Sequence, residues 1–205
     1  MNAVAQPVQL AITGTVSPQA CQLNTQEEGI NYRQIASGLL HPTGFTPLPP
    51  AEMAILINCQ RPTLFAVSLR DNRAGTVPDG MDAQFGELPG RLFGLGEVAG
   101  KRLGAYTATF GRMQIGPMPL YPISAPSDRS GWTLVGEQTL SPDPGEGLQY
   151  AWSWGNAPGR HTPSSIDRVV SNIWIRPYLN RVADLPDVGN DSALDGSMTI
   201  TLHYL

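Results

Sequence analysis

The chain has 205 residues, of which 41% are hydrophobic. A chain of this length can bury one sizeable core, and this hydrophobic content is too high for a disordered chain. Its formal net charge is −4 and Lys101 is the only lysine, so no basic run exists that could follow a phosphate backbone. We therefore expect no nucleic-acid partner. No apolar stretch is long enough to cross a bilayer, so we also expect no direct membrane span.

The two cysteines bear on the compartment. No charged start followed by an apolar segment is visible, so the chain reads either as cytosolic or as a mature exported protein with Met1 added. Cys21 and Cys59 are 38 residues apart, with no further cysteine and no histidine near either, which argues against a metal site. Both lie in segments that read as strands, so a disulfide is favoured over two buried free thiols. A disulfide points to an oxidising compartment.

The 22 glycines and 19 prolines are spread over the whole length, as in a chain of many short strands and turns. No repeat or composition shift marks a second domain, so one all-β sandwich or barrel is predicted. Helical periodicity is confined to a short stretch at Ser164–Ser171, and Gly116–Gly131 reads as turn material. The predicted strands are Val8–Val16, Gln19–Leu23, Ile30–Ile35, Met53–Cys59, Leu64–Arg70, Arg102–Phe110, Trp132–Val135, Leu148–Trp154, Ile173–Leu179 and Ser197–Tyr204.

The first predicted strand alternates strictly, which indicates one face meant for a core. Its apolar face carries a glycine, which leaves nothing to pack. Either something approaches closely at that position or the strand has a bulge there. The residues on this face are Val8, Leu10, Ile12, Gly14 and Val16.

The last predicted strand also alternates and runs almost to the final residue, Leu205. Chain termini usually fray, so we expect something to hold this strand in place. Its apolar face consists of Met198, Ile200, Leu202 and Tyr204.

Catalytic and cofactor patterns are weak. His161, Ser164 and Asp167 are close in sequence, but a catalytic triad is a spatial arrangement and this proximity does not indicate one. The glycine-rich segment Gly94–Lys101 fails the spacing of a phosphate-binding loop and reads as a hairpin. No metal-ligand spacing occurs. We predict no enzyme activity, no metal and no cofactor.

The order and spacing of several motifs resemble chaperone–usher pilus subunits. The run VQLAITGTVSPQAC has alternating apolar residues and a glycine seven residues before the first cysteine, and Tyr204 is penultimate. Further segments are similar to a pilin-related family, formerly of unknown function, of fimbrial subunits. These segments are Ile57-Asn58-Cys59, Asp71-Asn72-Arg73, Phe93-Gly94-Leu95-Gly96 and Leu103-Gly104-Ala105-Tyr106. The resemblance is thinnest across Gly111–Gly147, whose role the sequence does not reveal. Pilins usually carry a glycine before the last strand, and Ser192 stands at that place, with Gly189 and Gly196 nearest.

The resemblance implies an incomplete immunoglobulin-like β-sandwich, completed by a donor strand from a neighbouring subunit. Residues 1–17 would be the donor-strand extension, and residues 18–205 the pilin-like domain. The resemblance also implies an acceptor groove between the last strands and a disulfide between Cys21 and Cys59. The expected acceptor residues are Ile173, Ile175, Met198, Ile200, Leu202 and Tyr204.

The implied function is that of a structural subunit of a surface pilus or fimbria, secreted through the periplasm and used for attachment or biofilm formation. Its implied partners are further copies in a head-to-tail fibre, a periplasmic chaperone and an outer-membrane usher. The alternative is a monomeric adhesin or carbohydrate-binding β-sandwich. In that case the first strand would complete its own fold, and Trp152 and Trp154 would face a ligand.

Overall fold

A computed structural model of the chain describes residues 20–26, 29–86, 90–111, 113–115, 118–126, 131–134, 139–142, 150–155, 161–186 and 193–205. The predicted first strand, Val8–Val16, and the predicted domain boundary after residue 17 lie outside these residues.

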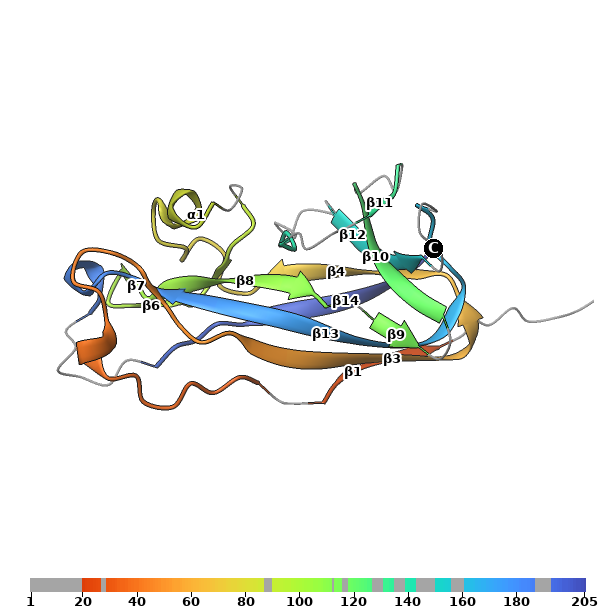
Figure 1. Cartoon of the computed structure of the whole chain (residues 1–205), viewed down its shortest axis with the longest axis horizontal. Helices are drawn as coiled ribbons and strands as arrows, with labels where there is room; N and C mark the ends of the chain where they lie inside the picture. Colours follow the sequence, from red (N-terminus) through yellow and green to blue (C-terminus); the bar gives the residue numbers. More distant parts are fainter. Residues whose placement is uncertain are drawn as a thin grey trace, which may run out of the picture.

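The described residues form an elongated, nearly all-β structure (Figure 1). Short helical segments are η1 (Ser37–Leu39), α1 (Met81–Gln84) and η2 (Val182–Asp184). The strands are β1 (Cys21–Thr25), β2 (Thr46–Pro47), β3 (Ala51–Thr63), β4 (Phe65–Asp71), β5 (Phe93–Gly94), β6 (Glu97–Val98), β7 (Lys101–Arg102), β8 (Gly104–Phe110), β9 (Met113–Ile115), β10 (Met118–Pro126), β11 (Thr133–Leu134), β12 (Tyr150–Gly155), β13 (Ile166–Leu179) and β14 (Met198–Tyr204).

Two antiparallel sheets make up the sandwich. The first has the strand order β1-β3-β13-β8-β5, with β2 also paired to β13. The second has the order β11-β10-β12-β4-β14, with β9 also paired to β10. Strands β6 and β7 form a separate hairpin. The all-β class predicted from the sequence is confirmed.

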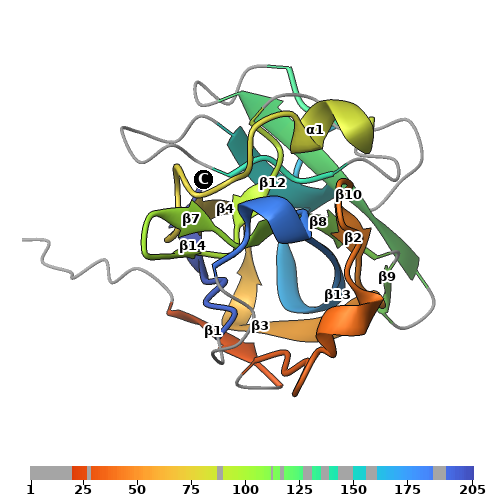
Figure 2. The same cartoon turned by 90° about the vertical axis from the view of Figure 1, so that its left-hand side faces the viewer.

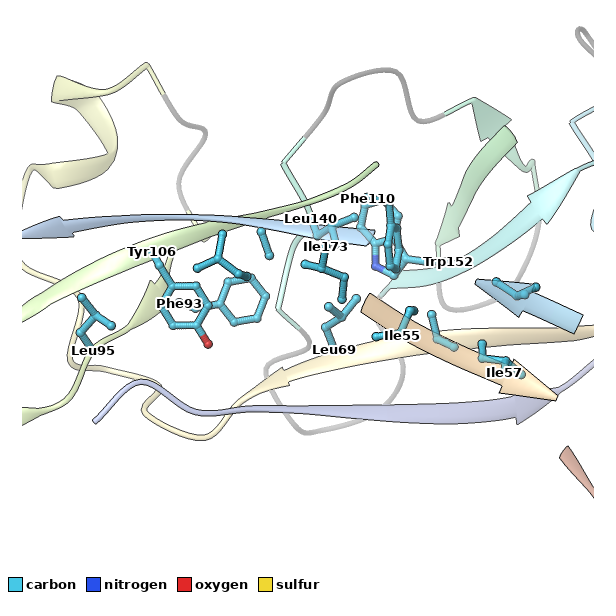
Figure 3. Packing of buried hydrophobic residues seen from close by; sticks show 14 of the residues in the cluster. Ile55, Ile57, Leu69, Phe93, Leu95, Tyr106, Phe110, Leu140, Trp152 and Ile173 are labelled. Atoms are coloured by element: carbon cyan, nitrogen blue, oxygen red, sulfur yellow. The ribbon is translucent and has the colours of Figure 1, made fainter. Parts of the chain in front are cut away.

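The core lies between the sheets because the long strands place apolar side chains on their inward faces. Ile55 and Ile57 of β3 are fully buried, and Ile173 of β13 joins them from the neighbouring strand. From the opposite sheet come Leu69 of β4 and Trp152 of β12 (Figure 3). This packing accounts for the burial of Trp152 without any ligand.

The strand order matches that of an immunoglobulin-like sandwich lacking its last strand. In immunoglobulin domains, strands A, B, E and D form one sheet, and C, F and G form the other. Here β1, β3, β13 and β8 take the places of A, B, E and D, in the right chain order, while β4 and β14 take the places of C and F. Among the described residues, no strand lies beyond β14, where strand G would pair.

A second, smaller core packs outside the first sheet. The segment after β4, which includes α1, brings Phe85 onto Tyr178 of β13, with the ring centroids 3.8 Å apart. Phe45 joins the cluster, and the Arg181 guanidinium lies 4.8 Å from its ring centroid. The segment between β4 and β5 has no alternating pattern, and the sequence does not predict α1.

Three sequence expectations are wrong. Residues 166–171, where the sequence favours a short helix, belong to β13, because they pair with β3 in an antiparallel ladder. Residues 30–35 form no regular strand. Much of Gly116–Gly131 is strand β10 rather than turn, and it was missed because its prolines, such as Pro122, cannot donate to a ladder and so argue against a strand.

The carboxylate of Asp71 is buried at the end of β4. It accepts hydrogen bonds from the backbone N–H groups of Gly94 and Arg73, each at 2.8 Å. Burial raises the pKa of this carboxyl, while the two N–H groups and the nearby Arg73 guanidinium oppose that rise. The carboxylate therefore ties the turn after β4 to β5.

We expect Asp71→Asn to destabilise the domain by about 1–3 kcal/mol, because an amide offers one acceptor where two N–H donors need one each. The measurement is the urea midpoint of the purified chain. Asp79→Asn is the matched control, since the Asp79 side chain is 99% exposed and its ion pair with Arg102 lies at the surface. Equal midpoints for the two variants would contradict the structural role given to Asp71.

Candidate strand-binding groove

Strand β14 has an unpaired backbone edge. The N–H of Asn72 donates to the carbonyl of Ser197, and the N–H of Leu205 donates to the carbonyl of Leu64. The backbone N–H and C=O groups of the odd-numbered residues of β14 therefore bond to β4. Because these groups alternate in direction along an antiparallel strand, those of even-numbered residues such as Ile200 point away from β4. In the described part of the chain, no strand pairs with this edge.

Strand β1 presents a matching edge. The N–H of Gln26 donates to the carbonyl of Ala54, in register with the pair Cys21 and Cys59. The backbone groups of Cys21, Leu23 and Thr25 therefore point away from β3. Strands β1 and β14 lie on the same side of the sandwich (Figure 2), one from each sheet.

A groove lies between these two edges. Its cavity has a volume of about 640 Å³, with Leu23 on the β1 side, Ile200 on the β14 side, and Tyr106 and Ile175 contributed by the core strands β8 and β13. The full lining is Leu23, Asn24, Thr25, Gly29, Ile30, Tyr32, Met53, Leu95, Tyr106, Ile175, Pro177, Leu194, Gly196, Ser197, Met198 and Ile200.

The groove continues past the end of β1. A second cavity of about 1320 Å³ shares Gly29, Ile30, Tyr32 and Leu194 with the first, so the two cavities adjoin along one channel on this side of the molecule. Its apolar lining includes Leu103 and Leu179 of the main core. The hydrophobic interior is thus accessible along this side of the molecule.

The apolar side chains along the channel are only partly buried. Residues that pack on the core yet remain half-exposed include Leu23, Ile30, Leu194, Met198 and Ile200. Burying such side chains is the main favourable term in folding, and an open apolar channel beside an unpaired sheet edge favours association with another strand. An unpaired backbone edge beside partly exposed apolar side chains is the kind of surface to which an extended strand can be added.

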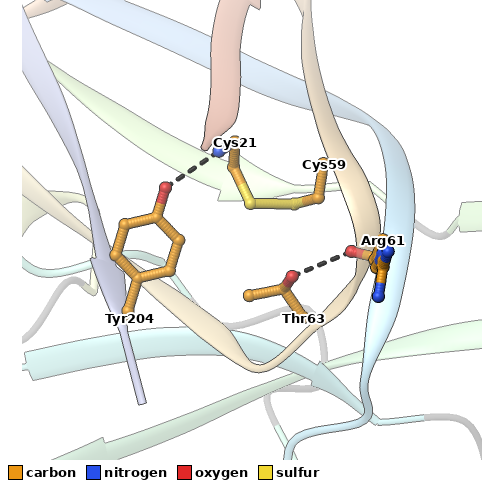
Figure 4. Close-up of a disulfide and its surroundings, with 5 residues drawn as sticks. All are labelled: Cys21, Cys59, Arg61, Thr63 and Tyr204. Atoms are coloured by element: carbon orange, nitrogen blue, oxygen red, sulfur yellow. Dashed lines mark hydrogen bonds between the residues drawn. A yellow bond between two sulfur atoms is a disulfide. The ribbon is translucent and has the colours of Figure 1, made fainter. Parts of the chain in front are cut away.

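Tyr204 closes one end of the groove. Its hydroxyl oxygen accepts a hydrogen bond of 2.8 Å from the backbone N–H of Cys21, which bridges β14 and β1 (Figure 4). Cys21 is in turn disulfide-bonded to Cys59 of β3. The cavity lining ends at Leu23 on β1, one inward-facing residue before this bridge, and at Ile200 on β14, with Leu202 between it and the bridge.

The wall that leads into β14 is held by charge and by close packing. The Arg73 guanidinium donates to both carboxylate oxygens of Asp195, at 2.7 and 2.8 Å, and lowers the pKa of that carboxyl. The next residue, Gly196, lies directly on Leu95 and Tyr106. Burial raises the pKa of Tyr106, so its phenol stays neutral on the groove floor.

The predicted acceptor residues occupy four kinds of position. Ile175, Met198 and Ile200 line the groove. Ile173 is fully buried in the core and does not line the groove, and Leu202 packs half-buried against the core beyond the end of the cavity. Tyr204 forms the end bridge described above.

Sequence reasoning missed the opposite wall and the floor. The sequence predicts Leu23, Ile30 and Tyr32 as strand residues without a role in a groove. Leu95 and Tyr106 lie in motifs that resemble a family, and Tyr106 also lies in a predicted strand. Their apolar character in short segments was visible, but which face they present depends on the pairing of distant strands. The predicted donor residues, Val8, Leu10, Ile12, Gly14 and Val16, lie outside the described residues.

The two tryptophans expected to face a ligand in the carbohydrate-binding alternative are buried. Trp152 is 4% exposed and Trp154 is fully buried, so neither faces a ligand. Tyr150, on the same strand, is 43% exposed. His161 accepts from the backbone N–H of Leu134 through its Nδ1 atom, at 3.2 Å.

Within the described ranges, no group of three or more His, Cys, Asp or Glu side chains is placed to hold a metal ion. Over the same ranges, no helix has the length and apolar character needed to cross a bilayer.

Comparisons with known proteins give two findings. A family model described as "Protein of unknown function (DUF1120)" matches residues 10–107. Among solved structures, the chain is similar to the "P pilus rod subunit PapA", with 10% sequence identity and a TM-score of 0.39, over 90% of this chain and 99% of that one. No curated protein matches the sequence. A TM-score this low does not establish a common fold, so the fold assignment rests on the strand order itself.

We expect Gly196→Val to destabilise the domain by about 1–3 kcal/mol, because even a Cβ atom at this position would lie 2.7 Å from Leu95 Cδ2 and 3.2 Å from Tyr106 Cε1. The measurement is the urea midpoint. Gly38→Val is the control, since a Cβ atom there meets nothing within 4 Å. A variant at Gly196 as stable as the control would show that the wall does not need this close approach.

Proposed function

We propose that the protein is a structural, non-catalytic subunit of a surface fibre, of the chaperone–usher pilus type, and that its groove accepts an extended strand from a neighbouring copy. The observation that carries the proposal is the pair of unpaired edges, β1 and β14, that flank an open apolar groove where an immunoglobulin-like sandwich would have strand G. An inserted strand could bond to both edges and cover the core side chains between them.

The N-terminal segment has the right pattern for the inserted strand. Its apolar face carries Val8, Leu10, Ile12 and Val16, and at roughly 1.5–3 kcal/mol for each buried side chain these contribute of order 10 kcal/mol before association costs. Gly14 would allow the strand to approach the groove closely at one point.

The position of Cys21 favours donation to a neighbour in one direction. Residues 1–19 join the domain just before Cys21, at the end of the groove that Tyr204 closes. If a strand inserted parallel to β14, the donor's domain would lie at this same end and would compete for space with the acceptor's own extension. If it inserted antiparallel to β14, the donor's domain would lie at the opposite end.

Antiparallel insertion can be repeated from copy to copy. The donated strand and the accepting groove are different surfaces, so each contact is head-to-tail and need not close into a ring. An open fibre follows. This orientation also reproduces the pairing of strands F and G in a complete immunoglobulin sandwich.

Before assembly, the groove requires a temporary cover. An open apolar channel beside a free sheet edge leads to aggregation, and a strand from a periplasmic chaperone would protect it. Passage through an outer-membrane usher to the cell surface, and a role of the fibre in attachment or biofilm formation, complete the proposal.

We expect deletion of residues 1–16 to abolish fibre formation while chaperone binding is retained, because the groove remains and the donor is lost.

We expect Leu10→Asp to weaken assembly at least tenfold, since one charge would be buried among the apolar side chains of the groove. Fibre yield is measured by electron microscopy and by size-exclusion chromatography of purified material.

Thr13→Asp is the matched control, because Thr13 lies on the polar face of the same predicted strand and its charge would remain in solvent. Normal fibres from the truncated chain, or equal losses for the substitutions at Leu10 and Thr13, would refute the donor-strand role.

A further inference from the structure

We propose that Tyr204 is a stop that fixes how far the inserted strand enters the groove, and so sets its register. This inference rests on the proposed function. It assigns to one side chain the choice of register, which the groove alone does not determine. Tyr204 acts here as a positioning residue.

The groove has one closed and one open end. At the Tyr204 end, the phenol crosses from β14 to the backbone of Cys21, and the cavity stops short of it. At the other end, the first cavity adjoins the second, larger one, with which it shares four lining residues. A strand that enters from the open end and runs antiparallel to β14 would meet Tyr204 with its leading residues, those near Val8.

Both ends of the bridge are firmly held. Tyr204 is paired with Phe65 of β4, which is 2% exposed, and Cys21 is covalently bound to Cys59. Adjacent strands in a sheet lie about 4.8 Å apart, so a gap for one strand is about 10 Å wide, and an extended tyrosine side chain that ends in a hydrogen bond can span it. The bridge therefore occupies the same space that a further stretch of inserted strand would need.

The bridge also uses a backbone group that such a strand would use. The N–H of Cys21 points away from β3 and would be the next donor in a ladder along β1. With Tyr204 accepting from it, this donor is satisfied and the ladder on this side begins at Leu23.

A donor strand with apolar residues at every second position can slip along the groove by two residues, and a barrier at one end prevents this. A slip by two residues, about 7 Å, keeps every apolar side chain on the groove face. The repeating apolar pattern of Val8, Leu10 and Ile12 therefore distinguishes poorly between registers. A fixed barrier at one end removes the deeper alternatives.

The test maps the register in fibres of the full chain. A photo-reactive diazirine amino acid replaces Gln9, which lies on the polar face of the predicted donor strand beside Val8. Fibres are irradiated, and the residues labelled on the neighbouring copy are identified by mass spectrometry. The comparison is between the otherwise native chain, Tyr204→Ala and Tyr204→Leu, the last of which keeps an apolar side chain too short to reach Cys21.

We expect a single labelled window in the native fibre. In both Tyr204 variants we expect a second window, displaced by two residues towards the C-terminal end of β14. Tyr150→Ala is the control, because Tyr150 is 43% exposed, close to the 44% of Tyr204, and is absent from the lining of both cavities. It should label like the native fibre.

The outcomes separate the two proposals. One unchanged window in the native fibre and in the variants would overturn the stop and leave the groove function standing. Loss of fibres in both variants would also overturn it, since a stop sets where the strand rests and not whether it enters. If the native fibre gave no labelling between copies, the proposed function itself would fail.

Discussion

The unpaired edge of β14 is the constraint on which the rest of the structure depends. A sandwich whose second sheet ends at this strand cannot cover the core side chains beneath it, so Ile175 and Ile200 remain accessible from a groove instead of being sealed inside. Closed barrels have no such edge, and open sheets usually blunt or cover theirs. Here the edge faces a second one, that of β1, across a gap lined by the core, and the site is a direct result of how the sheets end.

The walls of the groove are fixed by interactions within the domain. The ion pair of Arg73 with Asp195 and the close contact of Gly196 with Tyr106 fix the segment that leads into β14. On the other side, the disulfide fixes the start of β1 to β3. Both walls are fixed by contacts within the domain. Binding of an extended segment would therefore cost little conformational entropy in the walls, and such preorganisation favours binding.

Much of this could be predicted from the sequence, and the reason lies in local patterns. The alternation of Met198 to Tyr204 predicted the last strand, and the strand positions of Cys21 and Cys59 predicted their pairing. The sequence did not reveal the wall formed by residues 29–32 or the place of Tyr106 on the floor, because these depend on contacts between strands far apart in the chain. Strand β10 was missed because its prolines argue against a ladder, although tertiary pairing with β12 forms one.

The position of the disulfide has a mechanical consequence. Cys21 is the first residue of β1, so any pull on the preceding segment reaches the domain at that residue. There the covalent link to Cys59 passes the tension straight to β3, an inner strand flanked by two others. The remaining hydrogen bonds of β1 are thereby shielded from peeling.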